Sequence, residues 1–189
     1  MMTLVFFLEE LSAQAFLESF LPSILPSDFS VQYIVFEGKS DLEKRLAQRL
    51  RGWNKPNCKF IVLRDQDSAD CKEVKSGLVA KCKEGSHPET LVRIACHELE
   101  SWYLGDLLAV QIGLVENGLS KFQGKAKFRN PDELNNAADE LVKLTKGKYQ
   151  KVSGSREIGK YMTASTNRSH SFNMFYNGVL RLIETDINH

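Results

Sequence analysis

The sequence predicts an α/β fold of three layers, Rossmann-like, with a mostly parallel four-stranded sheet between helices and additional C-terminal helices. Two observations predict this class. Four short apolar runs rich in β-branched residues lie in the first half of the chain, and segments with helical periodicity separate them. Parallel strands need such crossovers, because the chain must return to the same end of the sheet before each new strand begins. After the fourth run the strand signals fade and only helical patterns follow.

The four apolar runs give the strands, in chain order Thr3–Leu8, Val31–Phe36, Lys59–Leu63 and Thr90–Ala95. A helix follows the first run, with apolar residues three and four apart from Ala13 to Ile24, and prolines 22 and 26 end or distort it. A second helix is predicted from Asp41 to Arg51, where Ser40 and Glu43 have the spacing of a capping box. A third spans Ala69 to Lys83.

Four further helices are expected after the last strand, at His97–Val115, Pro131–Leu144, Arg156–Met162 and Asn167–Ile187. They are separated by one long connection around Gly118–Asn130. With 189 residues and 42% hydrophobic content, the chain is expected to form one domain over residues 1–189. In this interpretation residues 1–96 form the sheet core, and residues 97–189 form a helical extension packed on it.

The N-terminal stretch is apolar but carries glutamates at 9, 10 and 18, so neither a signal peptide nor a membrane span is expected. The four cysteines, at 58, 71, 82 and 96, include no CxxC pair. This spacing argues against structural zinc and favours reduced, mostly buried thiols in a cytoplasmic protein.

The charges are distributed unevenly. Residues 1–119 carry 13 Lys and Arg against 17 Asp and Glu, whereas residues 120–169 carry 11 against 5. A basic stretch after an acidic half is suited to holding a polyanion over a metal site, so nucleic acid is a candidate partner. The alternative is a solvated, lysine-rich helical face.

Acidic residues follow two of the predicted strands. Glu9 comes after the first, and Asp65 and Asp67 come after the third. Ligands of parallel sheets bind beyond the carboxyl ends of the strands, and oxygen-only ligands suit Mg²⁺ or Mn²⁺. The sequence therefore predicts a metal site made by these three residues. Helix N-capping by Asp67 or Ser68 is the structural alternative for the Asp-x-Asp pair.

Six segments in order resemble the bacterial domain-of-unknown-function family 4276. They are FFLEELSAQAFLESFLPSIL, FEGKSDLEKRLAQRLRG, VLRDQDSADCKEVK, RIACHELESWYLGD, FRNPDEL and NRSHSF. The resemblance implies a Toprim-like fold, in which Glu9, Asp65 and Asp67 hold one or two Mg²⁺ ions for phosphodiester chemistry, as in topoisomerases, primases and overcoming-lysogenisation-type nucleases. It also implies a role in phage defence and a partner ATPase.

The chain departs from that family at one position of the site. Glu9 is followed by Glu10 where the family usually has glycine, which removes backbone freedom at the turn. Glu37 is the alternative ligand, because the string from Glu37 to Asp41 imitates the Toprim acidic motif. Glu9 is preferred, because the Toprim glutamate belongs to the first strand.

Secondary site residues lie in the second half of the chain. Glu100 matches the family's ELExW pattern and is a candidate second metal ligand, or an acid that satisfies helix N–H groups. His97 is either a base or a packing residue. Arg168 is a candidate phosphate clamp, together with the basic residues Lys125, Lys127 and Arg129.

These features predict a Mg²⁺-dependent Toprim-like nuclease or nuclease subunit with Glu9, Asp65, Asp67 and Glu100 as catalytic residues. The alternative is a catalytically inactive interaction module that regulates or recruits a partner ATPase, which the Glu9-Glu10 pair and the net charge of +1 favour. The sequence leaves the oligomeric state open.

Overall fold

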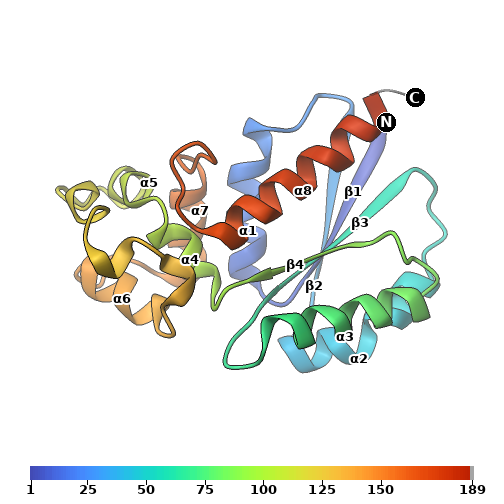
Figure 1. The fold of residues 1–189 in the computed structure, drawn as a ribbon. Coiled ribbons are helices and arrows are strands. Elements are labelled where there is room, and N and C mark those ends of the chain that lie inside the picture. Colours follow the sequence, from blue (N-terminus) through green and yellow to red (C-terminus); the bar gives the residue numbers. More distant parts are fainter. Residues whose placement is uncertain (188–189) are drawn as a thin grey trace.

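In the computed structural model, which describes residues 1–187, four parallel strands form one sheet in the order β2-β1-β3-β4 (Figure 1). The strands are β1 (Met2–Leu8), β2 (Phe29–Val35), β3 (Cys58–Asp65) and β4 (Leu91–Ala95). All three pairings are parallel. The predicted α/β class, with a parallel four-stranded sheet and further helices after it, is confirmed.

Helices cover both faces of the sheet. The helices are α1 (Leu11–Phe20), α2 (Lys39–Arg51), α3 (Cys71–Glu84), α4 (Leu99–Leu104), α5 (Leu107–Gly113), α6 (Ala137–Leu144), α7 (Lys151–Gly159) and α8 (His170–Ile187). Short 3-10 turns lie at Leu21–Ser23, Ser120–Phe122, Ala126–Phe128 and Pro131–Glu133. In Figure 1, α2 and α3 lie together on one face, and α1 and α8 lie on the other.

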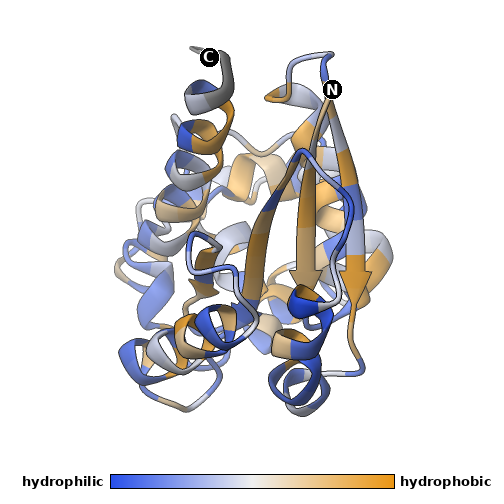
Figure 2. Cartoon of the chain, turned by 90° about the vertical axis from the view of Figure 1, so that its right-hand side faces the viewer, coloured by the Kyte–Doolittle hydropathy of each residue, from blue (hydrophilic) through white to orange (hydrophobic). Residues whose placement is uncertain are grey.

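The alternation of side chains along the strands explains the layers. On β1, Leu4, Phe6 and Leu8 belong to the core shared with α1 and α8, whereas Val5 and Phe7 belong to the core under α2 and α3. All five are fully buried. Figure 2 shows the result: apolar strands in the centre, with the hydrophilic sides of the helices turned outward.

Helices α4 to α6 lie beyond the end of β4 in Figure 1, and α7 packs along α1, with Gly159 close to Phe16. Trp102 and Tyr103 of α4 are fully buried and contact the ring of Phe16 in α1. The helical part therefore shares the larger core with the sheet, and it covers the edge at which the acidic residues lie.

Three of the sequence segments that resemble the family meet through hydrogen bonds. The Asp132 carboxylate accepts hydrogen bonds from the Ser169 hydroxyl (2.6 Å) and the Ser171 backbone N–H (2.7 Å) at the start of α8. The Asn167 amide donates to the Trp102 carbonyl at 2.8 Å. The Ser171 hydroxyl accepts from the Trp102 indole N–H at 2.8 Å. These polar residues thus join the start of α8 to α4 and to the turn before α6.

Several predicted boundaries were wrong. Helix α2 begins at Lys39 with Gly38 as its N-cap (φ 94°), so Ser40 and Glu43 do not form a capping box. The predicted helix at 97–115 is interrupted at Gly105, because Asp106 starts a new helix by accepting a hydrogen bond from the Ala109 N–H. Helix α7 begins at Lys151, ahead of the predicted start at Arg156.

The cysteines also differ from the expectation. All four are free thiols, but Cys82 is the one that is buried, while Cys58, Cys71 and Cys96 are partly exposed. In residues 1–187, no helix is both long enough and apolar enough to cross a membrane.

Gly105 provides a test of the close packing between α4 and the segment before α8. A Cβ atom there would lie 2.2 Å from the Asn167 side-chain oxygen and 2.9 Å from the Ser169 nitrogen. We expect Gly105→Ala to lower the free energy of unfolding by about 2–3 kcal/mol, measured by urea denaturation. Gly77→Ala is the control, because a Cβ there meets open space on α3 and should stabilise the helix by about 0.5–1 kcal/mol. Equal destabilisation by both substitutions would contradict this packing.

Candidate functional site

Five acidic residues from three segments meet at the carboxyl end of the sheet. We call Glu9, Glu10, Asp65, Asp67 and Glu100 the acidic cluster. Because β1 and β3 are neighbours in the sheet, Glu9 lies beside Asp65, and the Asp65 backbone N–H donates to Glu9 Oε2 at 3.3 Å. Glu100 reaches the same place from α4, which sits over the strand ends. The parallel pairing therefore brings together acids that are far apart in the sequence.

Asp65 carries the strongest electrostatic strain in the acidic cluster. It is the last residue of β3, and burial raises the pKa of its carboxyl well above the usual range. The negative charges of Glu100, Glu10 and Glu9 raise the pKa further, and Lys151 opposes them. Among residues 1–187, no hydrogen bond or ion pair reaches the Asp65 carboxylate. It is therefore a half-buried acid without a basic partner among other acids.

Glu100 and Glu10 lie on the side of the acidic cluster nearest α7. Glu100 is only 1% exposed, and burial raises the pKa of its carboxyl, although the Tyr149 hydroxyl donates to it at 2.8 Å. The Lys151 ammonium forms an ion pair with Glu10 at 2.7 Å and lowers the pKa of Glu100. Lys151 is thus the cation that serves this half of the acidic cluster.

Glu9 and Asp67 have different basic neighbours. Arg64 Nε lies 3.8 Å from Glu9 Oε2, while Arg64 Nη1 donates to Glu43 at 2.5 Å, so the buried guanidinium is shared between two acids. The Lys39 ammonium forms an ion pair with Asp67 at 2.7 Å. Burial, and then the charge of Asp67, raise the pKa of Glu9, while Arg64 and the Asp65 N–H lower it. Glu9, Glu10 and Asp67 therefore each have one basic partner, and Asp65 has none within the described chain.

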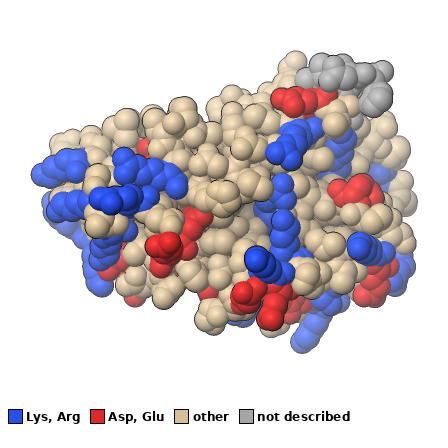
Figure 3. Space-filling model, in the orientation of Figure 1, with Lys and Arg blue, Asp and Glu red and all other residues tan. Residues whose placement is uncertain are grey.

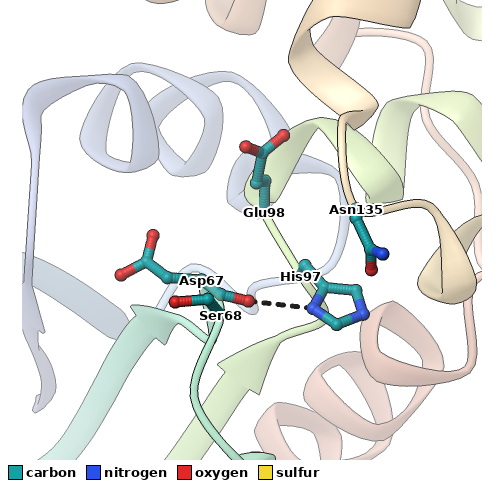
Figure 4. Close-up of a pocket in the computed structure, with 5 residues that line it drawn as sticks. All are labelled: Asp67, Ser68, His97, Glu98 and Asn135. Carbon is teal, nitrogen blue, oxygen red and sulfur yellow. Dashed lines mark hydrogen bonds between the residues drawn. The ribbon is translucent and has the colours of Figure 1, made fainter.

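Asp67 and His97 hold the two loops at this edge together. The Asp67 backbone N–H donates to the His97 carbonyl at 2.9 Å, and His97 Nδ1 lies 2.9 Å from the Asp67 carbonyl (Figure 4). Because a carbonyl only accepts, Nδ1 is the donor. Asp67 adopts a left-handed φ of 57° between these bonds. In Figure 4 its carboxylate points away from His97 and Glu98.

Two cavities flank the acidic cluster. The first, of about 460 Å³, is lined by Asp67, Ser68, His97, Glu98 and Asn135 (Figure 4). The second, of about 470 Å³, is lined by residues that include Glu100, Tyr149 and Lys151. A ligand at the acidic cluster would therefore have room on both sides.

The predicted phosphate-binding residues lie elsewhere. Arg168 donates to the Gln123 carbonyl at 2.7 Å, Lys127 forms an ion pair with Glu140 at 2.5 Å, and Lys125 sits over the Phe122 ring. Figure 3 shows lysines and arginines gathered at the far left of the molecule, over the helical part. In the described chain, neither these three side chains nor Arg129 forms an ion pair with the acidic cluster.

Other basic residues of the stretch 120–169 are also engaged in ion pairs. Lys146 and Lys148 both contact Glu116, whose pKa they lower to about 2, and Arg156 contacts Glu18. This arrangement agrees better with the solvated lysine-rich face than with a continuous groove for a polyanion.

The capping alternatives are also resolved. Asp70 caps α3 by accepting from the Lys72 and Glu73 N–H groups, so neither Asp67 nor Ser68 does. Ser169 caps α8 by accepting a hydrogen bond from the Phe172 N–H.

Glu37, the alternative metal ligand, is exposed after the edge strand β2, and its backbone N–H donates to Asp41.

The donor set is suited to a hard divalent cation, since carboxylate oxygens are the groups that Mg²⁺ and Mn²⁺ prefer. In residues 1–187, however, no three His, Cys, Asp or Glu side chains are already arranged as ligands of one ion. Asp65 and Glu100 could bind a cation without first breaking an ion pair, because no basic side chain is paired with either. Glu9 and Asp67 would have to exchange Arg64 and Lys39 for a metal.

The residues that surround the predicted acids follow from no local sequence pattern. Lys39 and Lys151 pair with Asp67 and Glu10, Arg64 lies between Glu9 and Glu43, and Tyr149 donates to Glu100. In the sequence, Glu10 stands out only as a departure from glycine. Arg64 gave one signal, because a charged residue inside an apolar strand is rarely buried without a partner.

The raised pKa of Asp65 makes stability dependent on pH. An acid whose pKa is higher in the folded state destabilises the fold when ionised, and this cost disappears as the pH falls through the folded pKa towards the unfolded value near ~4. We expect Asp65→Asn to raise the free energy of unfolding by about 1 kcal/mol near pH 8, with the gain vanishing at about pH 4. Urea denaturation of the wild type and of Asp65→Asn between about pH 4 and pH 8 measures this difference in the free energy of unfolding.

Asp67→Asn is the matched control. Asp67 is 36% exposed and paired with Lys39, and asparagine tolerates its left-handed backbone, so the change should stay within about 0.5 kcal/mol. Equal behaviour of the two variants at all pH values would contradict the strain assigned to Asp65.

Comparison with known proteins places this chain in one family. We found no significant match among curated proteins and none among solved structures. One family model matches residues 8–180, and its description is a domain of unknown function, DUF4276. The match includes all five acids of the acidic cluster, all of α2 to α7, and most of α8. The chain is therefore a member of the DUF4276 family.

Proposed function

We propose that this protein is a Toprim-like nuclease or nuclease subunit that depends on Mg²⁺ or Mn²⁺ and cleaves phosphodiester bonds in nucleic acid. The observation that carries the proposal is the Asp65 carboxylate, which is half-buried and has no basic partner, with Glu9, Glu10 and Glu100 close enough to raise its pKa. A fold gains no stability from such an arrangement. Strain of this kind at the ligand-binding edge of a parallel sheet is typical of a site that binds a cation.

The residues of the site have different roles in this proposal. Asp65 with Glu9 and Glu100 would hold the cation, and Asp67 would join them on releasing Lys39. A divalent cation supplies Lewis-acid chemistry at a phosphate and lowers the pKa of bound water. Tyr149 orients Glu100, and the Asp67–His97 pair fixes the loop that carries the Asp-x-Asp acids.

Phosphate oxygens would be held by the basic residues that border the acidic cluster. Lys39 and Lys151 are both about half exposed, and Lys151 also lines the second cavity. Their ammonium groups lie at opposite sides of the acidic cluster, one beside Asp67 and one beside Glu10. This assignment replaces that of Arg168, Lys125 and Lys127, whose side chains contact other groups, and of Arg129.

The proposal is tested with purified protein, plasmid and single-stranded substrates, and Mg²⁺ or Mn²⁺. We expect cleavage by the wild type, and a loss of at least about 100-fold in Asp65→Ala/Asp67→Ala, because two oxygen ligands are removed. Mn²⁺ binding measured by calorimetry should weaken in parallel. Glu37→Gln is the control and should keep activity within about twofold, since Glu37 is exposed and outside the acidic cluster.

Equal cleavage by the wild type and the double alanine variant would remove the assignment of these aspartates. A large loss in Glu37→Gln would instead transfer the role of Glu9 to Glu37.

One observation favours a second function, that of an inactive module of an ATPase complex. Three acids already have basic partners within the chain: Glu9 with Arg64, Glu10 with Lys151 and Asp67 with Lys39. Internal cations can take the place of a metal and leave the Toprim-like scaffold as a surface for a partner. Such a protein would show no millimolar Mg²⁺ or Mn²⁺ binding and would still copurify with its ATPase.

Lys39→Ala separates these two functions. If Asp67 binds a cation, removal of its competitor should tighten Mn²⁺ binding roughly two- to fivefold, the factor expected for an exposed ion pair of about 0.5–1 kcal/mol. Lys44→Ala, on the same helix, is the control and should leave the affinity unchanged. No Mn²⁺ binding by either the wild type or Lys39→Ala would favour the inactive module.

A further inference from the structure

Two cysteines from different elements lie in contact at the carboxyl end of the sheet. Cys71 is the first residue of α3, and Cys96 follows directly after β4. Their sulfur atoms are 3.5 Å apart. Both thiols are partly exposed, and both line a cavity of about 200 Å³ between α3 and α8. The pair is therefore close together and open to a small molecule.

We propose that Cys71 and Cys96 form a reversible intramolecular disulfide through exchange with a small anionic disulfide of the glutathione type. The sulfurs must approach by about 1.5 Å to reach the bond length of ~2.05 Å, which side-chain rotation on two partly exposed residues can supply. The other cysteines are excluded as partners: Cys58 begins β3 at the opposite end of the sheet, and Cys82 is buried near the far end of α3.

The exchange balances without any other reactant. The Cys71 thiolate attacks one sulfur of the disulfide RSSR, forms a mixed disulfide and releases one thiolate. The Cys96 thiol then loses its proton to water, attacks Cys71 Sγ and releases the second thiolate. Two cysteine thiols are oxidised, one RSSR is reduced to two RSH, and two protons are transferred overall.

The order of attack follows from the surroundings of Cys96. Burial raises the pKa of the Cys96 thiol to about 12, and Cys71 beside it contributes. Cys96 is therefore a poor first nucleophile, and it becomes effective once Cys71 carries the mixed disulfide at its side.

The rim of the cavity suits an anionic disulfide. Lys75 and Arg93 line it together with His170, and Lys75 is exposed. Arg93 is held in place by donating to the Met174 carbonyl at 2.8 Å. Two cations beside a thiol pair favour a reagent that carries carboxylates, such as glutathione disulfide, over a cationic one such as cystamine.

The disulfide would tie together the two segments that flank the acidic cluster. Cys96 precedes His97, whose ring and carbonyl bond to Asp67, and Cys71 follows the loop that contains Asp67. Any effect of oxidation on metal binding rests on the proposed function, whereas formation of the disulfide does not.

The test uses the full-length reduced protein, incubated with glutathione disulfide and then digested with trypsin without reductant. Lysines and Arg93 separate the two cysteines in sequence, so the disulfide appears as a Cys71 peptide joined to a Cys96 peptide. We expect this cross-link in the wild type, in Cys58→Ser and in Asp65→Ala/Asp67→Ala. The oxidised protein should also melt roughly 5–10 °C higher, with reversal by reductant.

Cys71→Ser and Cys96→Ser should yield no cross-link. Cys96→Ser should carry a glutathione adduct on Cys71, whereas Cys71→Ser should carry little or none on Cys96, the poor first nucleophile. Glutathione adducts without the cross-link in the wild type, or a cross-link to Cys58, would overturn the proposal. Asp65→Ala/Asp67→Ala lacks two of the proposed metal ligands but retains both cysteines. A cross-link in this variant therefore tests the disulfide independently of whether the protein is a nuclease.

Discussion

The parallel pairing of β1 with β3 is the constraint on which the candidate site depends. Parallel neighbours end at the same edge of a sheet, so the residues after β1 and at the end of β3 must meet there. The Asp65 N–H bond to Glu9 is the direct result. Helix α4 then covers this edge and adds Glu100 from above. An intervening strand would have kept these carboxylates apart.

The negative charges of the acidic cluster are compensated unevenly by basic side chains. Lys39 and Lys151 each pair with one acid of the cluster, and Arg64 is shared between Glu9 and Glu43. Asp65 and Glu100 have no ion pair within the described chain. Ionised carboxylates that are partly removed from water repel each other, because their fields are poorly screened. The cost falls mainly on Asp65. A bound cation at this point would relieve the repulsion, and this is the physical link between the charge distribution and the proposed chemistry.

The helical part holds the edge of the sheet through polar contacts as well as through the core. Asp132 binds the start of α8, and Asn167 binds the carbonyl of Trp102 in α4. Each is a buried or half-buried polar group with its partners supplied by a distant segment. Arg168 belongs to this framework, since its guanidinium donates to the Gln123 carbonyl. The charged and polar residues of these segments thus serve the packing of the helices, and the two thiols at the same edge remain accessible.

The sequence alone determined the fold class and the strands, because apolar runs alternate with helical periodicity, and it singled out Glu9, Asp65 and Asp67, because acids that end strands of a parallel sheet share one edge. The tertiary structure decided what local patterns do not encode. Gly105 packs closely against Asn167 where α4 gives way to α5, and Glu10 and Asp65 lie near Glu100 and Lys151, which are more than thirty residues away in the chain. Contacts between distant segments decide which groups a charged side chain pairs with. Spacing along the chain decides only the position of that side chain on its own helix or strand.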